Sequence, residues 1–218
     1  MSRFGAEPPD HLAPYFFGDE YTVAVSYSRD RQRFALASAL IDGLLLLTLL
    51  LTGFPGQVAR WLEATALPPL GAAAATVLVM GVPFYLLSVI ESAYSQFVIE
   101  ERHGFNRMSA GLFAADQLKG VLLGILLGLP LLLFLIWTVD ALGSYWWVYA
   151  FIGVSLFQLA LAFVFPIWIM PLFYSFTPLE EGSLKERLGE IASQVGFTLT
   201  SVQVMDGSRR SSHSNAFF

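Results

Sequence analysis

Four long apolar stretches separated by short polar segments dominate the first 170 residues of the chain. A hydrocarbon core of about 30 Å takes around 20 helical residues to cross, and each stretch is close to that length. A soluble amphipathic helix would instead present a polar face every three or four residues. The pattern therefore predicts four transmembrane helices, over residues 34–51, 70–90, 121–139 and 145–170.

The pattern changes abruptly after residue 171, where polar and turn-forming residues replace the apolar stretches. Residues 183–195 place leucine, isoleucine and valine at helical spacing, and Gly196 follows them. Ser183 and Glu186 match a capping box, in which two side chains satisfy free backbone N–H groups at a helix start. This segment is predicted to be one amphipathic helix.

A short β element is predicted after this helix. Residues 197–205 alternate apolar and polar positions, as a half-buried strand does. Asp206 and Gly207 form a dipeptide that favours the tight turn of a hairpin. One short helix with one or two strands buries too little apolar surface to be stable alone, so we expect this domain to be truncated at residue 218.

Three parts are therefore predicted: a polar tail over residues 1–33, a four-helix transmembrane region over residues 34–171, and the beginning of a water-facing domain over residues 172–218. The tail contains prolines and charges and no long apolar run, so it lacks the apolar centre of a cleavable signal peptide. We expect the first apolar helix to direct membrane insertion.

The composition agrees with a membrane protein. Hydrophobic residues make up 56% of the chain and charged residues 13%, against about 45–50% and 25% in a soluble domain. With 12 Lys plus Arg and 17 Asp plus Glu, the net charge is −5, so the basic surplus that binds nucleic acid is missing. Cysteine is absent, which excludes disulfides and thiolate metal sites.

The basic residues predict an orientation, because Lys and Arg near the ends of spans tend to stay cytoplasmic. On one side, the two loops hold only Arg60. The other side carries Arg29, Arg31, Arg33, Arg102, Arg107, Lys119, Lys185, Arg187, Arg209 and Arg210. Both ends of this chain and a loop over residues 96–120 are therefore predicted to be cytoplasmic, with Trp146, Trp147 and Tyr149 at the opposite interface.

The sequence contains no complete catalytic motif. It has no H-E-x-x-H, no G-x-S-x-G, no phosphate-binding glycine loop and no cysteine nucleophile. Its three histidines, at positions 11, 103 and 213, are far apart, and isolated histidines are more often solvated loop residues than metal ligands.

Asp42 is the charged residue inside the predicted spans. It lies about nine residues, or roughly 14 Å, into the first span, where an ionised carboxylate facing lipid would cost at least about 2.5 kcal/mol. We therefore expect Asp42 to face protein or water. Two arrangements would keep Asp42 away from lipid. In one it lines a polar intramembrane chamber or ion path, and in the other it is a carboxylate hydrogen-bonded between helices.

Two polar segments flank the spans, over residues 97–106 and 209–215. By their charge alone, the first reads as a solvated turn and the second as a polar hairpin arm. Their residue order is more specific. Three segments occur in the order and spacing of known signature segments. They are F-V-I-E-E-R-H-G-F-N over residues 97–106, P-L-F-Y-S-F-T-P-L over residues 171–179 and D-G-S-R-R-S-S-H-S-N-A-F over residues 206–217.

These three segments resemble the type I CAAX prenyl proteases, which are membrane-embedded zinc metalloendopeptidases. The resemblance implies a mainly α membrane protein, with four transmembrane helices followed by the start of an α/β zincin-like peptidase domain. It also implies that the zinc-binding H-E-x-x-H lies beyond residue 218, where zinc-activated water would attack a peptide carbonyl. This chain alone is then expected to lack the zinc ligands and to be inactive.

The resemblance places Asn215, with Ser214 and Ala216 on either side, at the Ser-Asn-Ala segment beside the family's active site. Asn215 there would donate its amide to the scissile carbonyl, or it would only brace the hairpin. An edge strand at this place would pair with an extended peptide substrate. Asp42 would suit a polar chamber within the membrane. The implied partners are the lipid bilayer and a peptide or protein substrate.

The polar tail resembles the shorter bacterial members, since eukaryotic members carry an additional N-terminal spanning helix. This predicts a bacterial inner membrane location and leaves the substrate open between prenylated proteins, membrane proteins under quality control and small exported peptides. Two other functions fit the residues. One is a non-catalytic scaffold or regulatory relative, and the other is a small transporter using Asp42, although the spans show no inverted repeat.

Overall fold

The computed structural model describes residues 19–198 and 201–212, and they fold as two compact units, over residues 1–150 and 151–218. Asn215, Ser214 and Ala216, and the histidines at 11 and 213, lie outside the described residues.

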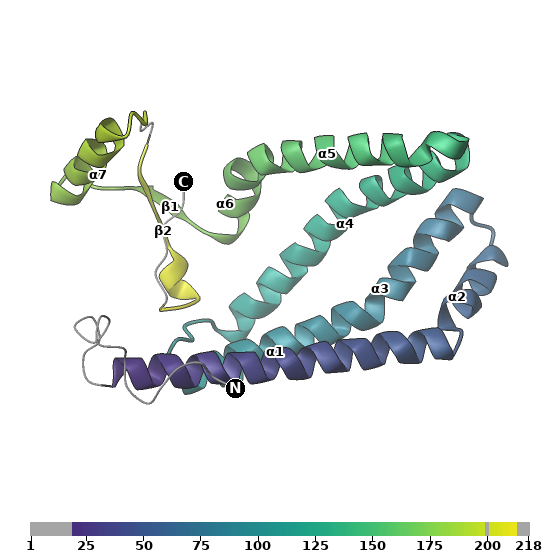
Figure 1. Cartoon of the computed structure of the whole chain (residues 1–218), viewed down its shortest axis with the longest axis horizontal. Helices are drawn as coiled ribbons and strands as arrows, with labels where there is room; N and C mark the ends of the chain where they lie inside the picture. The colour runs from purple at the N-terminus through teal and green to yellow at the C-terminus, as the bar shows by residue number, and fades with distance from the viewer. Residues whose placement is uncertain (1–18, 199–200, 213–218) are drawn as a thin grey trace. The chain divides into compact units, whose positions relative to one another are not determined.

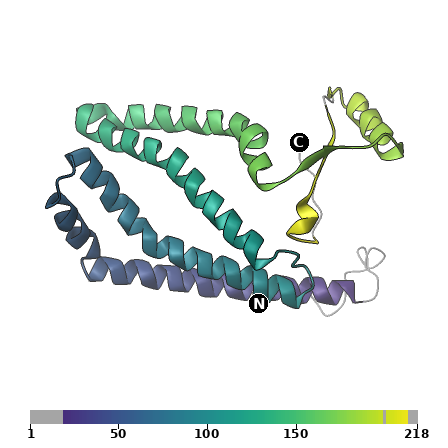
Figure 2. The same cartoon turned by 180° about the vertical axis from the view of Figure 1, so that it is seen from behind.

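Long helices build the first unit. α1 spans Glu20–Leu51, the short helix α2 spans Phe54–Glu63, and α3 spans Pro69–Tyr94. α3 continues without a break into a π-helical segment, η2, over Ser95–Glu100. α4 spans Ala110–Ala141, the 3₁₀ turn η3 spans Gly143–Tyr145, and α5 starts at Trp146 and runs to Val164. Figures 1 and 2 show α1 and α3 running in opposite directions, with α2 at the turn between them.

The helices confirm the prediction of four membrane spans. Four helical segments of the described chain are long and apolar enough to cross a bilayer: Glu20–Leu51, Pro69–Glu100, Ala110–Ala141 and Gly143–Phe173. Few residues in their apolar parts are buried inside the protein, and many of their large apolar side chains are exposed. A soluble protein rarely leaves so much contiguous apolar surface in water, so lipid is the solvent that these helices require.

The core of the first unit lies where α2 folds back onto α3. Val58 and Leu62 of α2 and Ala72 of α3 are buried against one another. Small alanines let the two helices approach closely, as membrane helices often do. The helix α2 was not predicted, because its ten residues carry an apolar face too short to register as a span.

The second unit holds the rest of α5 from residue 151, a π-helical segment η4 over Phe165–Ile169, and the one-turn helix α6 over Met170–Phe173. Strand β1 spans Phe176–Pro178, helix α7 spans Ser183–Gln194, strand β2 spans Gln203–Met205, and the 3₁₀ turn η5 spans Gly207–Arg209. β1 and β2 pair antiparallel, with Phe176 opposite Met205 and Pro178 opposite Gln203.

Several local predictions need correction. The loop expected over residues 96–120 is mostly helical, because η2 extends to Glu100 and α4 begins at Ala110. α7 occupies the predicted place, but its N-cap is Gly182 and no side-chain cap bond forms, so the capping box of Ser183 and Glu186 is wrong.

The predicted strand is also shorter than expected. Of residues 197–205, β2 includes only the last three, and its partner β1 lies in a segment that was not predicted as a strand. Asp206 and Gly207 lead into the 3₁₀ turn η5 in place of a tight hairpin turn, and Gly207 does not have a positive φ. These short strands form because they pair with residues far away in the sequence, and their own residues show little local preference for a strand.

Candidate functional site

A hydrogen-bonded cluster joins the start of α1 to the end of η2 in the first unit. The Tyr27 hydroxyl donates to Glu100 Oε1, and Arg31 Nη1 donates to the Tyr27 oxygen at 3.3 Å. Asp30 Oδ2 lies 3.1 Å from Arg102 Nη1 and 3.2 Å from His103 Nε2. We call these six residues the α1–η2 cluster.

Aromatic rings pack around the cluster. Tyr27 meets both His103 and Phe105 edge-on, with ring centroids 5.4 and 4.9 Å apart. The ring of Phe97 in η2 meets Phe113 of α4 in the same way at 5.4 Å. The segment 97–106, which looked like a solvated turn from its charge, therefore joins three helices.

The backbone after η2 makes a tight turn that places these side chains. Gly104 has φ of +74°, a conformation that costs other residues about 1–2 kcal/mol. Past it, Asn106 bonds in three directions: Gln96 Nε2 donates to Asn106 Oδ1 at 2.5 Å, Met108 N donates to the same oxygen at 2.8 Å, and Asn106 Nδ2 donates to Glu101 Oε2 at 2.8 Å. The amide of Asn106 thus closes the loop before α4.

Burial and hydrogen bonding within the cluster shift two pKa values. Tyr27 and Asp30 precede the apolar part of α1, which starts at Phe34. Burial raises the pKa of Tyr27, and its bond to the Glu100 carboxylate adds to the rise. The hydrogen bond from His103, with Arg102 beside it, lowers the pKa of Asp30. No local sequence pattern indicates the Tyr27–Glu100 bond, because its partners are 73 residues apart.

In the second unit, the β1–β2 pair is fastened at one end by Asp206. Ser175 N donates to Asp206 Oδ1 at 2.8 Å, and Asp206 N donates to the Ser175 carbonyl at 3.1 Å. Arg210 follows on the same side: its Nη2 donates to the Phe173 carbonyl at 2.6 Å, and its guanidinium lies 4.4 Å from the centroid of the Tyr174 ring. Residues 173–175 and 206–210, which belong to two of the resemblance segments, therefore meet in space.

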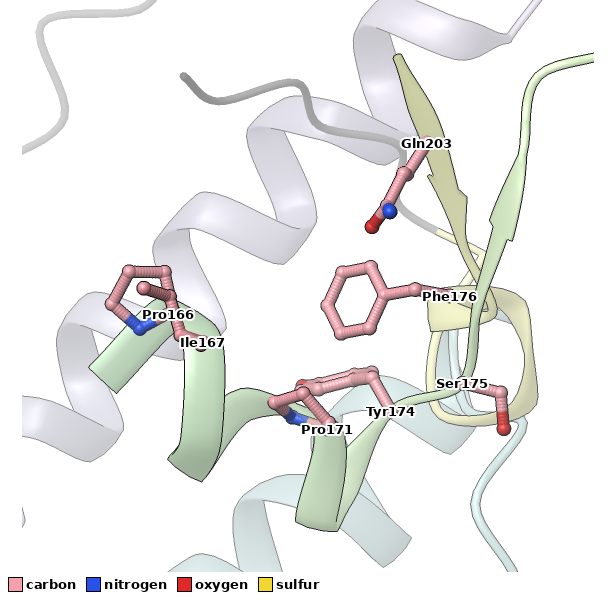
Figure 3. A pocket seen from close by; sticks show the side chains of 7 residues that line it. All are labelled: Pro166, Ile167, Pro171, Tyr174, Ser175, Phe176 and Gln203. Atoms are coloured by element: carbon pink, nitrogen blue, oxygen red, sulfur yellow. The ribbon is translucent and has the colours of Figure 1, made fainter. Parts of the chain in front are cut away.

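A pocket of about 660 Å³ opens beside this pair. Figure 3 shows the Phe176 ring pointing into it, with Gln203 on one side and Tyr174 and Pro171 on the other. Pro166 and Ile167 close the far wall, and Ser175 completes the lining. Apolar rings with one amide form the kind of surface that holds an apolar side chain of a bound chain.

The predicted site residues are not brought together by the described part of the structure. Asp42 lies in α1 with an exposed side chain, four residues after Ser38, whose hydroxyl is buried. No group of three or more His, Asp or Glu side chains that could hold a metal occurs within residues 19–198 and 201–212. These residues therefore do not fit a zinc site.

The comparisons with known proteins agree with the three segments. The family model for the CAAX prenyl protease N-terminal region, described as having five membrane helices, matches residues 1–175. A probable CAAX prenyl protease 1 of Schizosaccharomyces pombe is 34% identical over 97% of this chain and 48% of its own length. A CAAX prenyl protease 1 homolog of Caenorhabditis elegans is 31% identical over 96% of this chain and 46% of its own.

The structural comparison also covers nearly the whole chain. The crystal structure of S. mikatae Ste24p superposes with a TM-score of 0.84 and 28% identity, over 96% of this chain and 50% of that one. The chain thus spans about half the length of these relatives. The resemblance inferred from the signature segments is confirmed: this chain belongs to the family of the CAAX prenyl protease N-terminal region.

Proposed function

We propose that this chain is the N-terminal membrane portion of a zinc-dependent membrane endopeptidase. The observation that carries the proposal is the likeness to Ste24p over 96% of the chain, which includes the β1–β2 pair as well as the membrane helices. The S. pombe and C. elegans relatives are named as CAAX prenyl proteases. A shared membrane fold, together with the β1–β2 pair that the likeness includes, supports the same class of reaction here.

Zinc, when bound to such an enzyme, lowers the pKa of its water and polarises the peptide carbonyl. The described residues do not supply its ligands. We propose that the ligands come from the half of the protein that the relatives have and this chain does not match, and that this chain alone is inactive. What the chain contributes is the surface that holds the peptide.

The proposed substrate is a peptide or protein segment in extended conformation. In the described sheet β1 and β2 pair only with each other, so each has a second edge whose N–H and C=O groups can pair with an added strand. The pocket beside Phe176 and Gln203 would take one apolar side chain of that strand. The hydrogen bond from Ser175 N to Asp206 holds β1 in place for pairing with the added strand.

Asn215, between Ser214 and Ala216, is proposed to donate its amide to the scissile carbonyl. It follows η5 by six residues in the sequence, within the segment that resembles the family's Ser-Asn-Ala signature. Asp42 is proposed to face a polar space within the membrane, because it shares a face of α1 with the buried Ser38 hydroxyl.

A substrate assay tests the pocket. On the complete protein, Phe176→Ala should raise KM for an apolar peptide about ten-fold or more, since burying a Phe side chain is worth about 1.5–3 kcal/mol, and kcat should change little. Leu172→Ala, which removes an exposed apolar side chain outside the pocket, is the matched control. Equal effects of both variants would refute the pocket's role.

The zinc proposal has its own test. The coding sequence after residue 218 is read for H-E-x-x-H, and the complete protein is assayed for chelator-sensitive peptide cleavage. The motif with cleavage supports the proposal. A stop codon at that point, or a complete protein that cleaves nothing, would leave a non-catalytic membrane scaffold as the function.

We also propose that both ends of this chain are cytoplasmic, on the distribution of Lys and Arg, and that the membrane is a bacterial inner membrane, on the polar character of residues 1–33. The chain has no cysteine, so single cysteines can be introduced without background. In intact cells, an impermeant maleimide should label Thr65→Cys and leave Ser109→Cys unlabelled. The reverse pattern would invert the topology.

A further inference from the structure

One face of α1 carries a continuous stripe of exposed side chains that changes from basic to apolar. The stripe begins with Arg29 and Arg33 and continues with leucines three or four residues apart. The leucines are Leu36, Leu40, Leu44, Leu47 and Leu51, and they are exposed by 66%, 61%, 64%, 54% and 85%. Residues at this spacing lie on one side of a helix.

The stripe lies away from the rest of the unit. α1 packs through a different face, on which Tyr27 bonds Glu100, Phe34 stacks on Tyr94 at 5.1 Å, and the Ser38 hydroxyl is buried. At 100° per residue, Arg29 and Arg33 point roughly opposite to Tyr27 and Phe34. The basic end and the leucines therefore face the surroundings of the unit together.

Neither arginine has a protein counter-ion within the described residues. Asp30, the nearest carboxylate in sequence, is engaged by Arg102 and His103 on the packing face. Arg31 differs, because it bonds the Tyr27 hydroxyl and lies 5.7 Å from the Tyr27 ring centroid. Two exposed guanidinium groups on the stripe are thus left to bind an anion from outside.

The part of the stripe nearest the arginines has the dimensions of one bilayer leaflet and its headgroups. Leu36 to Leu47 covers about 16.5 Å, close to half of a hydrocarbon core of about 30 Å. Arg33 and Arg29 lie about 4.5 and 10.5 Å beyond Leu36 along the axis, and a headgroup layer is roughly 5–8 Å thick on each side. Arginine side chains reach several ångströms and snorkel toward the interface.

We propose that Arg29, Arg33 and the leucine stripe of α1 bind an anionic phospholipid. Its phosphate and charged headgroup pair with the two guanidinium groups, which suit phosphate geometry, and its acyl chains lie along the leucines. A protein partner would need a carboxylate pair followed by an apolar helix of matching length. A lipid supplies the charge and an apolar chain of one leaflet's length in one molecule, which matches the arginines and the leucines nearest to them.

Native mass spectrometry of the full chain in detergent tests this binding. The probe lipids are phosphatidylglycerol and phosphatidylcholine with identical acyl chains. The wild type should retain phosphatidylglycerol in preference to phosphatidylcholine. Arg33→Gln should reduce that preference about five-fold, because one arginine near an anionic lipid surface contributes about that factor to binding. Arg29→Gln/Arg33→Gln should abolish most of it, and Arg33→Lys should keep much of it.

Arg60→Gln is the matched control, because it removes an exposed arginine from α2. It should leave the lipid preference unchanged. An undiminished preference in the double variant, or an equal loss in Arg60→Gln, would overturn the proposal. Wild-type protein gives an independent test: its preference for phosphatidylglycerol should weaken as salt rises, and a salt-independent preference would contradict an ionic headgroup site.

Discussion

The hydroxyl of Tyr27 in α1 donates a hydrogen bond to the carboxylate of Glu100 at the end of η2, and this bond connects residues 73 positions apart. It ties the first membrane helix to the end of the second, at the end of the unit where His103 and Phe105 pack on the Tyr27 ring. The contact therefore sets how α1 and α3 are aligned along their lengths.

A double-mutant cycle measures that contact. Tyr27→Phe and Glu100→Gln should each lower the thermal unfolding midpoint in detergent, and together they should lower it by less than the sum. A bond to a carboxylate is worth about 1.5–3 kcal/mol, so we expect a coupling energy of about 1–2 kcal/mol.

Tyr94→Phe is the control for this cycle, since Tyr94 stacks on Phe34 through its ring. Its midpoint should match the wild type. Strict additivity of Tyr27→Phe and Glu100→Gln would show that the contact contributes nothing to stability.

Asp30 should make stability depend on pH at the acid end. Its pKa is lowered in the folded protein by His103 and Arg102, so its contribution is fully present above the ordinary value of 3.8 and is lost as pH falls through the lower, folded value. Asp30→Asn should therefore be less stable than wild type at pH 6, and the difference should shrink as pH falls below 3.8. Thermal melts of both proteins across this range check the prediction. A difference that persists at the lowest pH contradicts it.

Gly104 should tolerate no side chain without loss of stability. Its φ of +74° strains any L-residue, although no atom lies within 4 Å of an added Cβ. Gly104→Ala should therefore destabilise by about 1–2 kcal/mol. Gly120→Ala, on α4 with equally open space, should be neutral or slightly stabilising. Comparing the two melting temperatures separates backbone strain from crowding, and equal temperatures would exclude strain.

Removing the Asp206 carboxylate should loosen the β1–β2 pair. Asp206→Ala loses the acceptor for Ser175 N, so the amides of residues 174–178 should exchange with deuterium faster. Asp206→Asn keeps an acceptor oxygen at the same place and should stay close to wild type. Hydrogen–deuterium exchange by mass spectrometry reads this out. Unchanged exchange in Asp206→Ala would mean that the strand pairing alone holds the pair.

The sequence shows the residues of the candidate site only as three separate segments and does not show which of them contact one another. Residues 97–106, 171–179 and 206–217 resemble family signatures, but the charge of residues 97–106 suggests a solvated turn and that of residues 209–215 a polar hairpin arm. The structure brings Glu100, Arg102 and His103 onto α1 and brings Asp206 onto Ser175. These contacts depend on register between distant helices or strands, which no local pattern encodes.

The sequence alone determined the four membrane helices and the helix over residues 183–194, because lipid and helix geometry impose lengths and periods that can be read locally. It also determined the family, through ordered signature segments. Only the tertiary structure decided the π-helical end of α3, the packing of α2 on α3 and the pairing of β1 with β2. Those features are short, and their stability comes from contacts with residues far away in the chain, so their own residues carry too little preference to specify them.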